Sequence, residues 1–235
     1  GFGRVAGLTP PSNLCKLGGV AGLAPAANLR LSLSSMIFLA LLLAFFIGAI
    51  PFGVLIGKMR GVDVRAVGSG NIGATNVWRA LGPKAGTAAF VLDVLKGVAG
   101  PLLGKWLLPN QEIAIAACAI APVLGHTFSP FLGFKGGKGI STSLGALFGL
   151  IPWVGVVIFS IWGVILLFSR IISLSSIVVC VLLPFLAYFM GAPGPSVVVA
   201  GLMGTVAFLK HIPNLKRIGA GIEPKLGQKK PSPTA

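Results

Sequence analysis

Residues 36–57 read MIFLALLLAFFIGAIPFGVLIG, and this stretch decides what kind of protein the chain forms. It carries no charged side chain, and about 20 apolar residues in an α-helix are enough to cross the hydrocarbon core of a bilayer. Pro51 and two glycines, Gly53 and Gly57, interrupt the end of the stretch. We therefore predict a first membrane span over residues 36–57 that is broken near its end.

The rest of the chain repeats this apolar pattern. Hydrophobic residues make up 55% of the 235-residue sequence and charged residues only 10%, whereas a soluble domain carries about 25% charged residues. Further apolar runs lie at 85–103, 113–124, 140–151, 154–168, 171–190 and 197–209. Composition and runs together predict an all-α fold, a polytopic membrane helix bundle with about seven transmembrane helices.

The number of crossings depends on the two apolar runs that meet at Pro152. If they form two helices, the loops 58–84 and 125–139, Arg170 and the basic tail all fall on one face. The positive-inside rule then makes that face cytoplasmic and places the N-terminus outside. One long helix would instead put the basic tail outside, so we prefer seven crossings.

Three segments are expected along the chain. Residues 1–35 are rich in Gly, Ala and Pro and lack a helical stripe, which predicts a poorly structured N-terminal extension. Residues 36–211 are predicted to form the transmembrane bundle. Residues 212–235 are predicted to form a cytoplasmic C-terminal tail.

The chain is strongly basic, with 19 Lys and Arg against four Asp and Glu and a net charge of +15. Nucleic acid, anionic lipid and anionic substrates are the partners that such a balance favours. Nucleic acid fits poorly, because the basic residues lie in loops between apolar runs, without a basic helix or a platform of aromatic residues. The three cysteines lack metal-ligand spacing, so neither a metal nor a cofactor is expected.

A first polar block, GSGNIGATN, occupies residues 68–76. Its glycines match the dinucleotide fingerprint, but no βαβ unit surrounds them, so that interpretation is rejected. Glycines at a helix start still let backbone N–H groups converge on an anion. A helix-capping turn is the simpler alternative, but the density of small polar residues favours anion binding. The candidate ligands are Ser69, Gly70, Asn71, Gly73, Thr75, Asn76 and Arg79.

A second block, GHTFSPFLGFKGGKG, occupies residues 125–139. A Walker A motif would need Gly at position 132 and Ser or Thr at 139, so a nucleoside triphosphatase is rejected. The Gly-Gly-Lys-Gly turn before a helix start nevertheless suits a phosphate, although a basic loop beside a membrane is the simpler alternative. Its candidate ligands are Gly136, Gly137, Lys138 and Ser141, whereas His126 is expected to be structural.

A third block, KHIPNLKR, begins at residue 210 and continues to Glu223. His211 and Asn214 stand three residues apart at the end of the last apolar run, and Arg217 and Glu223 follow. Ser173, Ser175 and Ser176 are expected to face the same side, where they either cap a helix or, for Ser175 and Ser176, bind substrate. Asp93 and Lys96 form an intramembrane pair for which either an ion pair or a functional role is open.

Together the three blocks, at 69–76, 125–139 and 210–223, resemble the bacterial acyl-phosphate:glycerol-3-phosphate acyltransferases, the PlsY family. The resemblance covers about residues 36–223, with Leu215 as a mild departure where Ile is expected. It implies a seven-helix enzyme of the bacterial inner membrane with its active site on the cytoplasmic face. Such an enzyme moves a fatty acyl group from acyl phosphate to glycerol 3-phosphate and yields lysophosphatidic acid and phosphate.

Acyl transfer to a hydroxyl needs a proton acceptor and stabilisation of an oxyanion. Ser69, His211 and Asn214 are the candidate catalytic residues. We prefer transfer assisted by the phosphate of the substrate, followed by general-base catalysis by His211 and then a covalent acyl-Ser69 intermediate. The expected partners are the two substrates and membrane lipid. A transporter or channel for an anionic solute is the alternative, disfavoured because the blocks lie at one face and no inverted repeat is evident.

Overall fold

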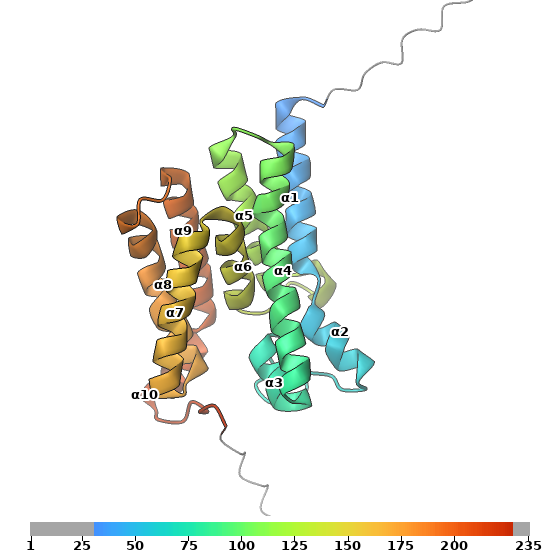
Figure 1. The fold of residues 1–235 in the computed structure, drawn as a ribbon. Helices are drawn as coiled ribbons and strands as arrows, with labels where there is room; N and C mark the ends of the chain where they lie inside the picture. The colour runs from blue at the N-terminus through green and yellow to red at the C-terminus, as the bar shows by residue number, and fades with distance from the viewer. Residues whose placement is uncertain (1–30, 228–235) are drawn as a thin grey trace, which may run out of the picture. The chain divides into compact units, whose positions relative to one another are not determined.

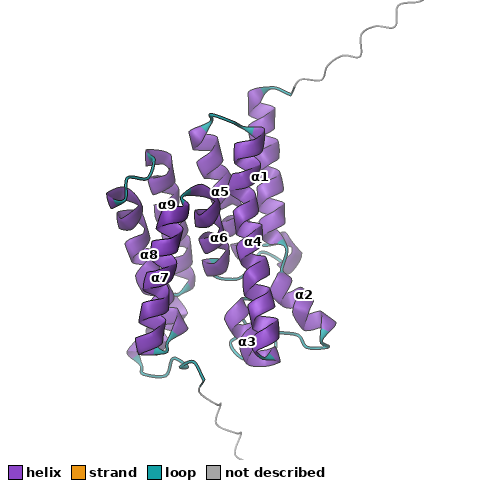
Figure 2. Cartoon of the chain, in the orientation of Figure 1, coloured by secondary structure: helices purple, strands orange, loops and turns teal. Residues whose placement is uncertain are grey.

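The computed structural model describes residues 31–227, and within this range all regular structure is helical (Figure 2). The helices in chain order are α1 (Leu33–Ala49), α2 (Phe52–Met59), α3 (Ala74–Leu81), α4 (Pro83–Leu107), α5 (Glu112–Thr127), the 3-10 helix η1 (Pro130–Leu132), α6 (Ile140–Leu150), α7 (Pro152–Ser169), α8 (Ile172–Phe189), α9 (Gly194–Lys210) and α10 (Ile212–Gly219).

Helix α1 begins at Leu33 rather than at Met36. Ser32 caps it, because the Ser32 hydroxyl accepts a hydrogen bond from the backbone N–H of Ser35 at 3.1 Å, as polar N-cap residues commonly do. Residues 33–35 of the predicted N-terminal extension therefore already belong to the first helical turn. Residues 1–30 of that extension lie outside the described part of the chain.

The helices cross the bundle in alternating directions (Figure 1). Five spans within residues 31–227 are long and apolar enough to cross a membrane. Helix α9, followed after a 55° bend by α10, adds a sixth, and α6 is a shorter apolar helix. The prediction of an all-α membrane bundle with about seven transmembrane helices is therefore confirmed.

The two runs that meet at Pro152 form a helical hairpin. Pro152 occupies the first turn of α7, where its missing N–H costs nothing, and the buried Ile151 makes the turn. Gly155 of α7 packs so closely on Phe148 and Leu147 of α6 that a Cβ would approach their side chains to 2.8–3.4 Å. The expected division of this region into two helices is thus observed.

Small residues let α4 lie at the centre of the bundle, packed against α1, α3, α5 and α6. A Cβ on Gly97 would overlap the carbonyl oxygen of Thr142, and one on Gly145 would overlap that of Val94. Glycine at both positions brings the backbones of α4 and α6 together, as is common where membrane helices associate. The close contact of α4 and α6 therefore fixes the positions of the helix ends that the polar loops join.

The break between α1 and α2 is held by polar side chains from elsewhere in the chain. Pro51 lacks the N–H needed to continue the α1 hydrogen-bond ladder. Lys96 of α4 donates a hydrogen bond to the Ile50 carbonyl at 2.8 Å, and the Ser129 hydroxyl donates to the Ala49 carbonyl at 2.7 Å. Carbonyl groups at a helix break inside a membrane need such partners.

Candidate functional site

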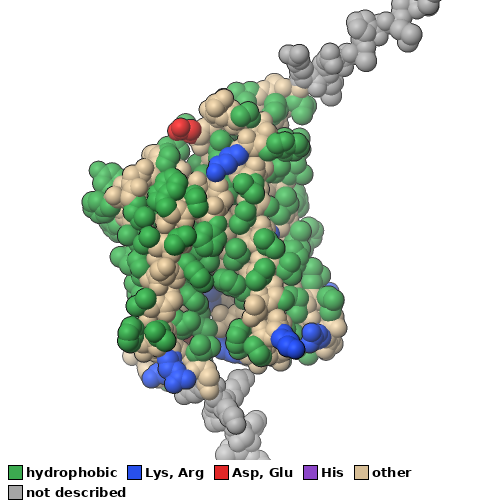
Figure 3. All heavy atoms as spheres, in the orientation of Figure 1, with side chains coloured by type: hydrophobic (Ala, Val, Ile, Leu, Met, Phe, Trp, Pro, Cys, Tyr) green, Lys and Arg blue, Asp and Glu red, His purple; other side chains and the backbone are tan. Residues whose placement is uncertain are grey.

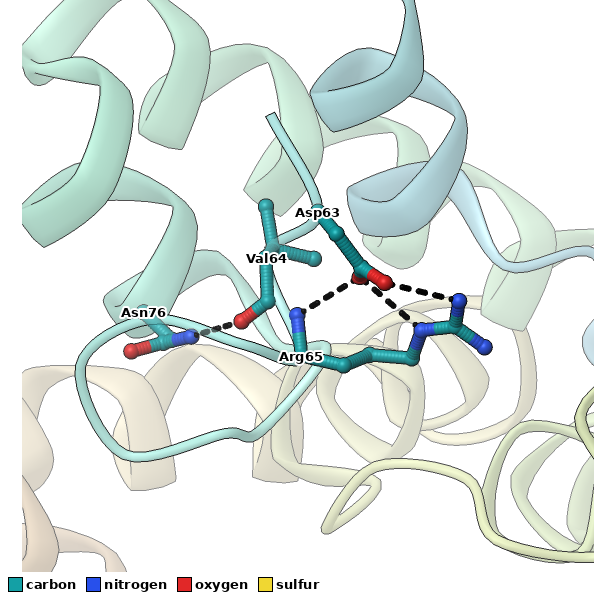
Figure 4. Close-up of polar contacts among 4 residues, drawn as sticks. All are labelled: Asp63, Val64, Arg65 and Asn76. Carbon is teal, nitrogen blue, oxygen red and sulfur yellow. Dashed lines mark hydrogen bonds and ion pairs between the residues drawn. The ribbon is translucent and has the colours of Figure 1, made fainter. Parts of the chain in front are cut away.

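The loop between α2 and α3 carries the first block and is anchored by Asn76 (Figure 4). The Asn76 amide nitrogen donates to the carbonyls of Val64 and Val67, and its amide oxygen accepts from the Ser69 N–H. At the loop start Asp63 and Arg65 form an exposed ion pair at 2.9 Å. The Ser69 hydroxyl is left exposed beside the N-terminus of α3.

Helix α3 begins directly after the first block, where the sequence predicts an anion-binding helix terminus. Its N-cap is Gly73, and the Asn71 side chain accepts a hydrogen bond from the Gly73 N–H at 2.8 Å. Within residues 31–227, the Thr75 hydroxyl and the Arg79 guanidinium form no hydrogen bond or ion pair. Thr75 lies in the first turn of α3 and Arg79 in its last turn, and both side chains line the same cleft, where they are available to an anion.

The second block folds back onto the end of α5. The backbone N–H of Gly136 donates to the Thr127 carbonyl at 3.2 Å, and that of Gly137 donates to the His126 carbonyl at 3.1 Å. A Cβ on Gly137 would overlap the His126 ring. Both N–H groups are therefore already hydrogen-bonded within the protein. The role of the two glycines is to shape the turn that carries Lys138.

The third block forms a hydrogen-bonded network around the Glu223 carboxylate. Glu223 accepts from the Ser173 hydroxyl at 2.7 Å, from the Asn214 amide at 2.6 Å and from the Arg217 guanidinium at 2.6 Å. The Asn214 oxygen in turn accepts from the Lys138 ammonium. Asn214 therefore links the second block to the third.

Some Lys and Arg side chains of the site form no ion pair with a carboxylate. Three of the four acidic residues each neutralise one base, in the pairs Asp63–Arg65, Asp93–Lys96 and Glu223–Arg217. Across residues 31–227, Arg79 and Lys138 form no ion pair. Both Arg79 and Lys138 line the cleft described below, so they bring positive charge without a carboxylate partner to it.

The surroundings of the cleft shift the pKa values of its titratable groups. Burial lowers the pKa of Lys138 to about 8, although Glu223 opposes this. Burial, and then the nearby Lys138 ammonium, lower the pKa of His211 to about 4. Burial alone raises the pKa of Glu223, but hydrogen bonds from Ser173, Asn214 and Arg217 outweigh it, so the net pKa lies below its usual value.

His211 has a defined tautomer. It follows Lys210, the last residue of α9, and its Nδ1 lies 2.8 Å from the Ala207 carbonyl oxygen. A carbonyl only accepts hydrogen bonds, so Nδ1 carries the proton. In the neutral ring, Nε2 is therefore the atom that can accept a proton or hydrogen bond.

The three blocks line one cleft of about 1270 Å³. Its inner part is apolar, with buried Leu147 and Met203 among its lining residues, and Phe90 of α4 and Phe159 of α7 lie at its side. The two rings stack with centroids 6.5 Å apart. Figure 3 shows the surface hollowed between α4 and α7, with Lys or Arg side chains in the hollow. Polar and apolar surfaces thus meet in one continuous space.

Most of the predicted site residues come together in this cleft, and four do not. The cleft is lined by Ser69, Asn71, Gly73, Thr75, Asn76, Arg79, Lys138, Ser141, Ser176, His211, Asn214, Arg217 and Glu223. Gly70, Gly136, Gly137 and Ser175 lie outside its lining. Ser175 instead donates its hydroxyl hydrogen to the Ile171 carbonyl within α8, at 3.2 Å.

Other cleft residues were not among the sequence-predicted site. Ser173, rather than Ser175, contacts the third block through Glu223. Asp93 and His126 also line the cleft, with 3.8 Å between Asp93 Oδ1 and His126 Nδ1. The His126 side chain, expected to bond structurally, forms no hydrogen bond within residues 31–227. In the same range, no group of three His, Cys, Asp or Glu residues is placed to hold a metal ion.

Fold and cleft together define a multi-pass membrane protein with a basic pocket that continues into an apolar groove. The family model described as glycerol-3-phosphate acyltransferase matches residues 38–221. The glycerol-3-phosphate acyltransferase of Desulfotalea psychrophila is 41% identical over 191 residues, covering 80% of this chain and 97% of the relative. That of Rubrobacter xylanophilus is 42% identical over 189 residues, with 80% and 94% coverage.

Solved structures agree with these relatives. The crystal structure of PlsY, an integral membrane glycerol 3-phosphate acyltransferase, in its glycerol 3-phosphate form has a TM-score of 0.78 and 38% identity. The match covers 81% of this chain and 96% of that one. Its lysophosphatidic acid form has a TM-score of 0.76 and 37% identity. The chain belongs to the glycerol-3-phosphate acyltransferase family, the PlsY family.

Proposed function

We propose that this protein transfers a fatty acyl group from acyl phosphate to glycerol 3-phosphate, producing lysophosphatidic acid and inorganic phosphate. Both substrates carry phosphate, and one also carries a long apolar chain. The observation that carries the proposal is the single cleft in which unpaired Arg79 and Lys138 adjoin an apolar groove. Family membership supports the same reaction.

The two unpaired cations are proposed to bind the phosphate groups. Arg79 can bind a phosphate through two parallel N–H groups, whereas the Lys138 ammonium is a compact charge. Arg217 is paired with Glu223, so it contributes mainly to the shape of the third block. The groove beside Phe90 and Phe159 is proposed to hold the acyl chain.

Chemistry then requires the glycerol hydroxyl oxygen to attack the acyl carbonyl carbon. The bond between that carbon and the phosphate oxygen breaks, and phosphate leaves with the electron pair. We favour a phosphate oxygen as the acceptor of the hydroxyl proton. A histidine with a pKa of about 4 is a weak base at neutral pH, while phosphate groups titrate near pH 6. His211 Nε2 then accepts a hydrogen bond from the other, non-attacking hydroxyl of glycerol 3-phosphate and so orients this substrate.

The end of the bundle with the three blocks is proposed to face the cytoplasm across the bacterial inner membrane. Of the Lys and Arg residues that the structure describes, all but Lys96 and Lys105 lie in segments at this end, and the positive-inside rule supports the orientation. In intact cells, with Cys15 replaced by Ser, an impermeant maleimide should label Asn110→Cys and spare Ala220→Cys. Labelling of Ala220→Cys but not of Asn110→Cys would refute the proposed orientation.

Purified protein in lipid nanodiscs, given acyl phosphate and glycerol 3-phosphate, tests the proposed reaction. Phosphate and lysophosphatidic acid should appear in equal amounts, and phosphate release should be slow without glycerol 3-phosphate. Acyl-coenzyme A should not replace acyl phosphate, and a chelator should have no effect. Transfer from acyl-coenzyme A alone, or no transfer from acyl phosphate, would overturn the proposal.

A further inference from the structure

We propose that Asn76 is a positioning residue: it holds the loop that carries Ser69 and does not bind the phosphorylated substrates itself. This inference rests on the proposed function only in placing Ser69 in the active cleft. It assigns Asn76 a role different from the substrate contact that its place in the first block predicts.

The contacts of Asn76 are all directed at the loop backbone. Its Nδ2 donates to the Val64 carbonyl at 2.7 Å, as Figure 4 shows, and to the Val67 carbonyl at 3.1 Å. Its Oδ1 accepts from the Ser69 N–H at 2.8 Å. Asn76 is 1% exposed, so one buried side chain closes the loop from Val64 to Ser69.

These contacts leave the Asn76 amide without a free N–H group that could donate to a phosphate. A phosphate offers only acceptor oxygens at neutral pH, so its protein ligands must donate hydrogen bonds. A primary amide has two N–H donors, and both are used by Val64 and Val67. Binding phosphate through Asn76 would therefore strip a hydrogen bond from the loop.

The anchor is fixed, whereas the loop it holds is exposed. Asn76 belongs to α3, whose next residue Val77 is fully buried, and α3 packs against α4. Ser69 is exposed, and Gly68 has a left-handed φ of 64°. A Cβ on Gly68 would overlap Asn76 Oδ1, so glycine is needed for this approach.

The loop has a second tie, the exposed Asp63–Arg65 ion pair. It joins residues only two apart at the loop start and does not reach Ser69. Exposed ion pairs add little to stability. Within residues 31–227, Asn76 is the one side chain with a hydrogen bond to the Ser69 backbone, so we assign the position of Ser69 to it.

Hydrogen exchange of the full chain in nanodiscs tests this without any substrate. Asn76→Ala should speed amide exchange in residues 64–72 and leave that of α8 and α9 unchanged, because only the loop loses its anchor. Asn110→Gly, an exposed asparagine in left-handed conformation between α4 and α5, is the matched control. Wild-type exchange over residues 64–72 in Asn76→Ala would overturn the proposal. If that variant does not fold, Asn76→Ser replaces it.

A double-mutant cycle with Ser69→Ala adds a kinetic test. Misplacing a group that positions the substrate by about 1 Å can cost roughly 10²-fold in rate, so Asn76→Ala should lower kcat by about that factor. If Asn76 acts through Ser69, the double variant should be about as slow as Ser69→Ala alone. Losses that multiply would instead indicate a direct substrate contact. A wild-type protein without acyl transfer would refute the proposed function while leaving the exchange result valid.

Discussion

Lys138 and His211 are the two residues whose ionisation bears on the chemistry, and burial shifts the pKa of both in the same direction. For Lys138 the result is a cation close to its titration point, because its pKa is about 8. For His211 the result is a neutral ring, because its pKa is about 4. The two residues therefore predict different dependence on pH.

Lys138 should make kcat/KM for glycerol 3-phosphate fall as the pH rises through about 8. The ammonium binds phosphate only when protonated, so the charge is present below that pH and lost above it. Lys138→Arg should give a lower kcat/KM that stays flat from about pH 7 to about pH 10, because guanidinium remains charged.

Steady-state kinetics of the wild type and the arginine variant across this pH range measure the effect. Arg79→Ala is the matched control, since it removes a phosphate partner but keeps Lys138, and its alkaline limb should remain. An unchanged alkaline limb in Lys138→Arg would assign the titration to another group.

His211→Gln should retain most of kcat if the phosphate of the substrate accepts the proton. Glutamine keeps a donor for the Ala207 carbonyl and a second polar atom for the glycerol hydroxyl. Loss of a general base would instead cost about 10²–10⁴-fold in kcat. A severe kcat defect in His211→Gln, with unchanged KM for glycerol 3-phosphate, contradicts the substrate-assisted mechanism.

Single residues also mark what the sequence could and could not predict about the site. The count of crossings placed the blocks of Ser69, Lys138 and His211 on one face, and in the structure all three residues line one cleft. The use of the Gly136 and Gly137 N–H groups within the protein depends on the fold-back of the loop onto α5. Such long-range contacts leave no periodic signal in the sequence.

At the scale of the elements, Lys96 and Asp93 connect α4 to the α1–α2 break. Their side chains are almost fully buried and lie 2.8 Å apart. The sequence identified them as an intramembrane pair, with either an ion pair or a functional role possible. Their geometry is that of an ion pair, and Lys96 also bonds to the Ile50 carbonyl.

Removing one member of this pair should destabilise the bundle more than replacing both. Asp93→Asn or Lys96→Met leaves a buried charge unpaired, which typically costs about 3–5 kcal/mol, whereas replacing the whole pair is often far less costly. The double variant Asp93→Asn/Lys96→Met should therefore unfold at a higher temperature than either single variant.

Thermal unfolding in detergent measures this order, with Arg65→Gln as the control. Arg65 belongs to the exposed pair with Asp63, so its loss should cost at most about 1 kcal/mol. If Arg65→Gln and Lys96→Met lower the unfolding temperature equally, the buried ion pair stabilises the protein no more than the exposed one.

Element boundaries followed from apolar runs, except where caps or packing moved them. The positive-inside rule predicted two helices on either side of Pro152, and Pro152 indeed occupies the first turn of α7. The start of α1 was placed too late, because the Ser32 cap extends the helix by one turn beyond the apolar run. The first turn of α1 is polar, so its composition alone resembles that of a loop.

For the whole molecule, residues 1–30 should be dispensable. The family match begins at residue 38, and the first described helix begins at Leu33. A truncated protein that starts at Ser32, after an initiating Met, should keep wild-type kcat and KM. One that starts at Met36 loses the Ser32 cap and should be less stable by about 1 kcal/mol.

Expression, acyltransferase assay and thermal unfolding of the two truncated proteins compare these outcomes. A well-inserted but inactive protein that starts at Ser32 would give residues 1–31 a role in catalysis. Fold class and family were predictable for the whole molecule because hydrophobicity and three long blocks are local properties. The shared cleft depends on how the helices pack against one another, and only the structure reveals that packing.

The hollow between α4 and α7 has a consequence for the kinetics of the enzyme. Both helices cross the bilayer, so the groove beside Phe90 and Phe159 opens toward lipid. We therefore expect the acyl phosphate of the proposed reaction to enter by lateral diffusion from the leaflet and not from bulk water. Its effective concentration is its mole fraction in the bilayer, so added lipid dilutes this donor but leaves the dissolved acceptor unaffected.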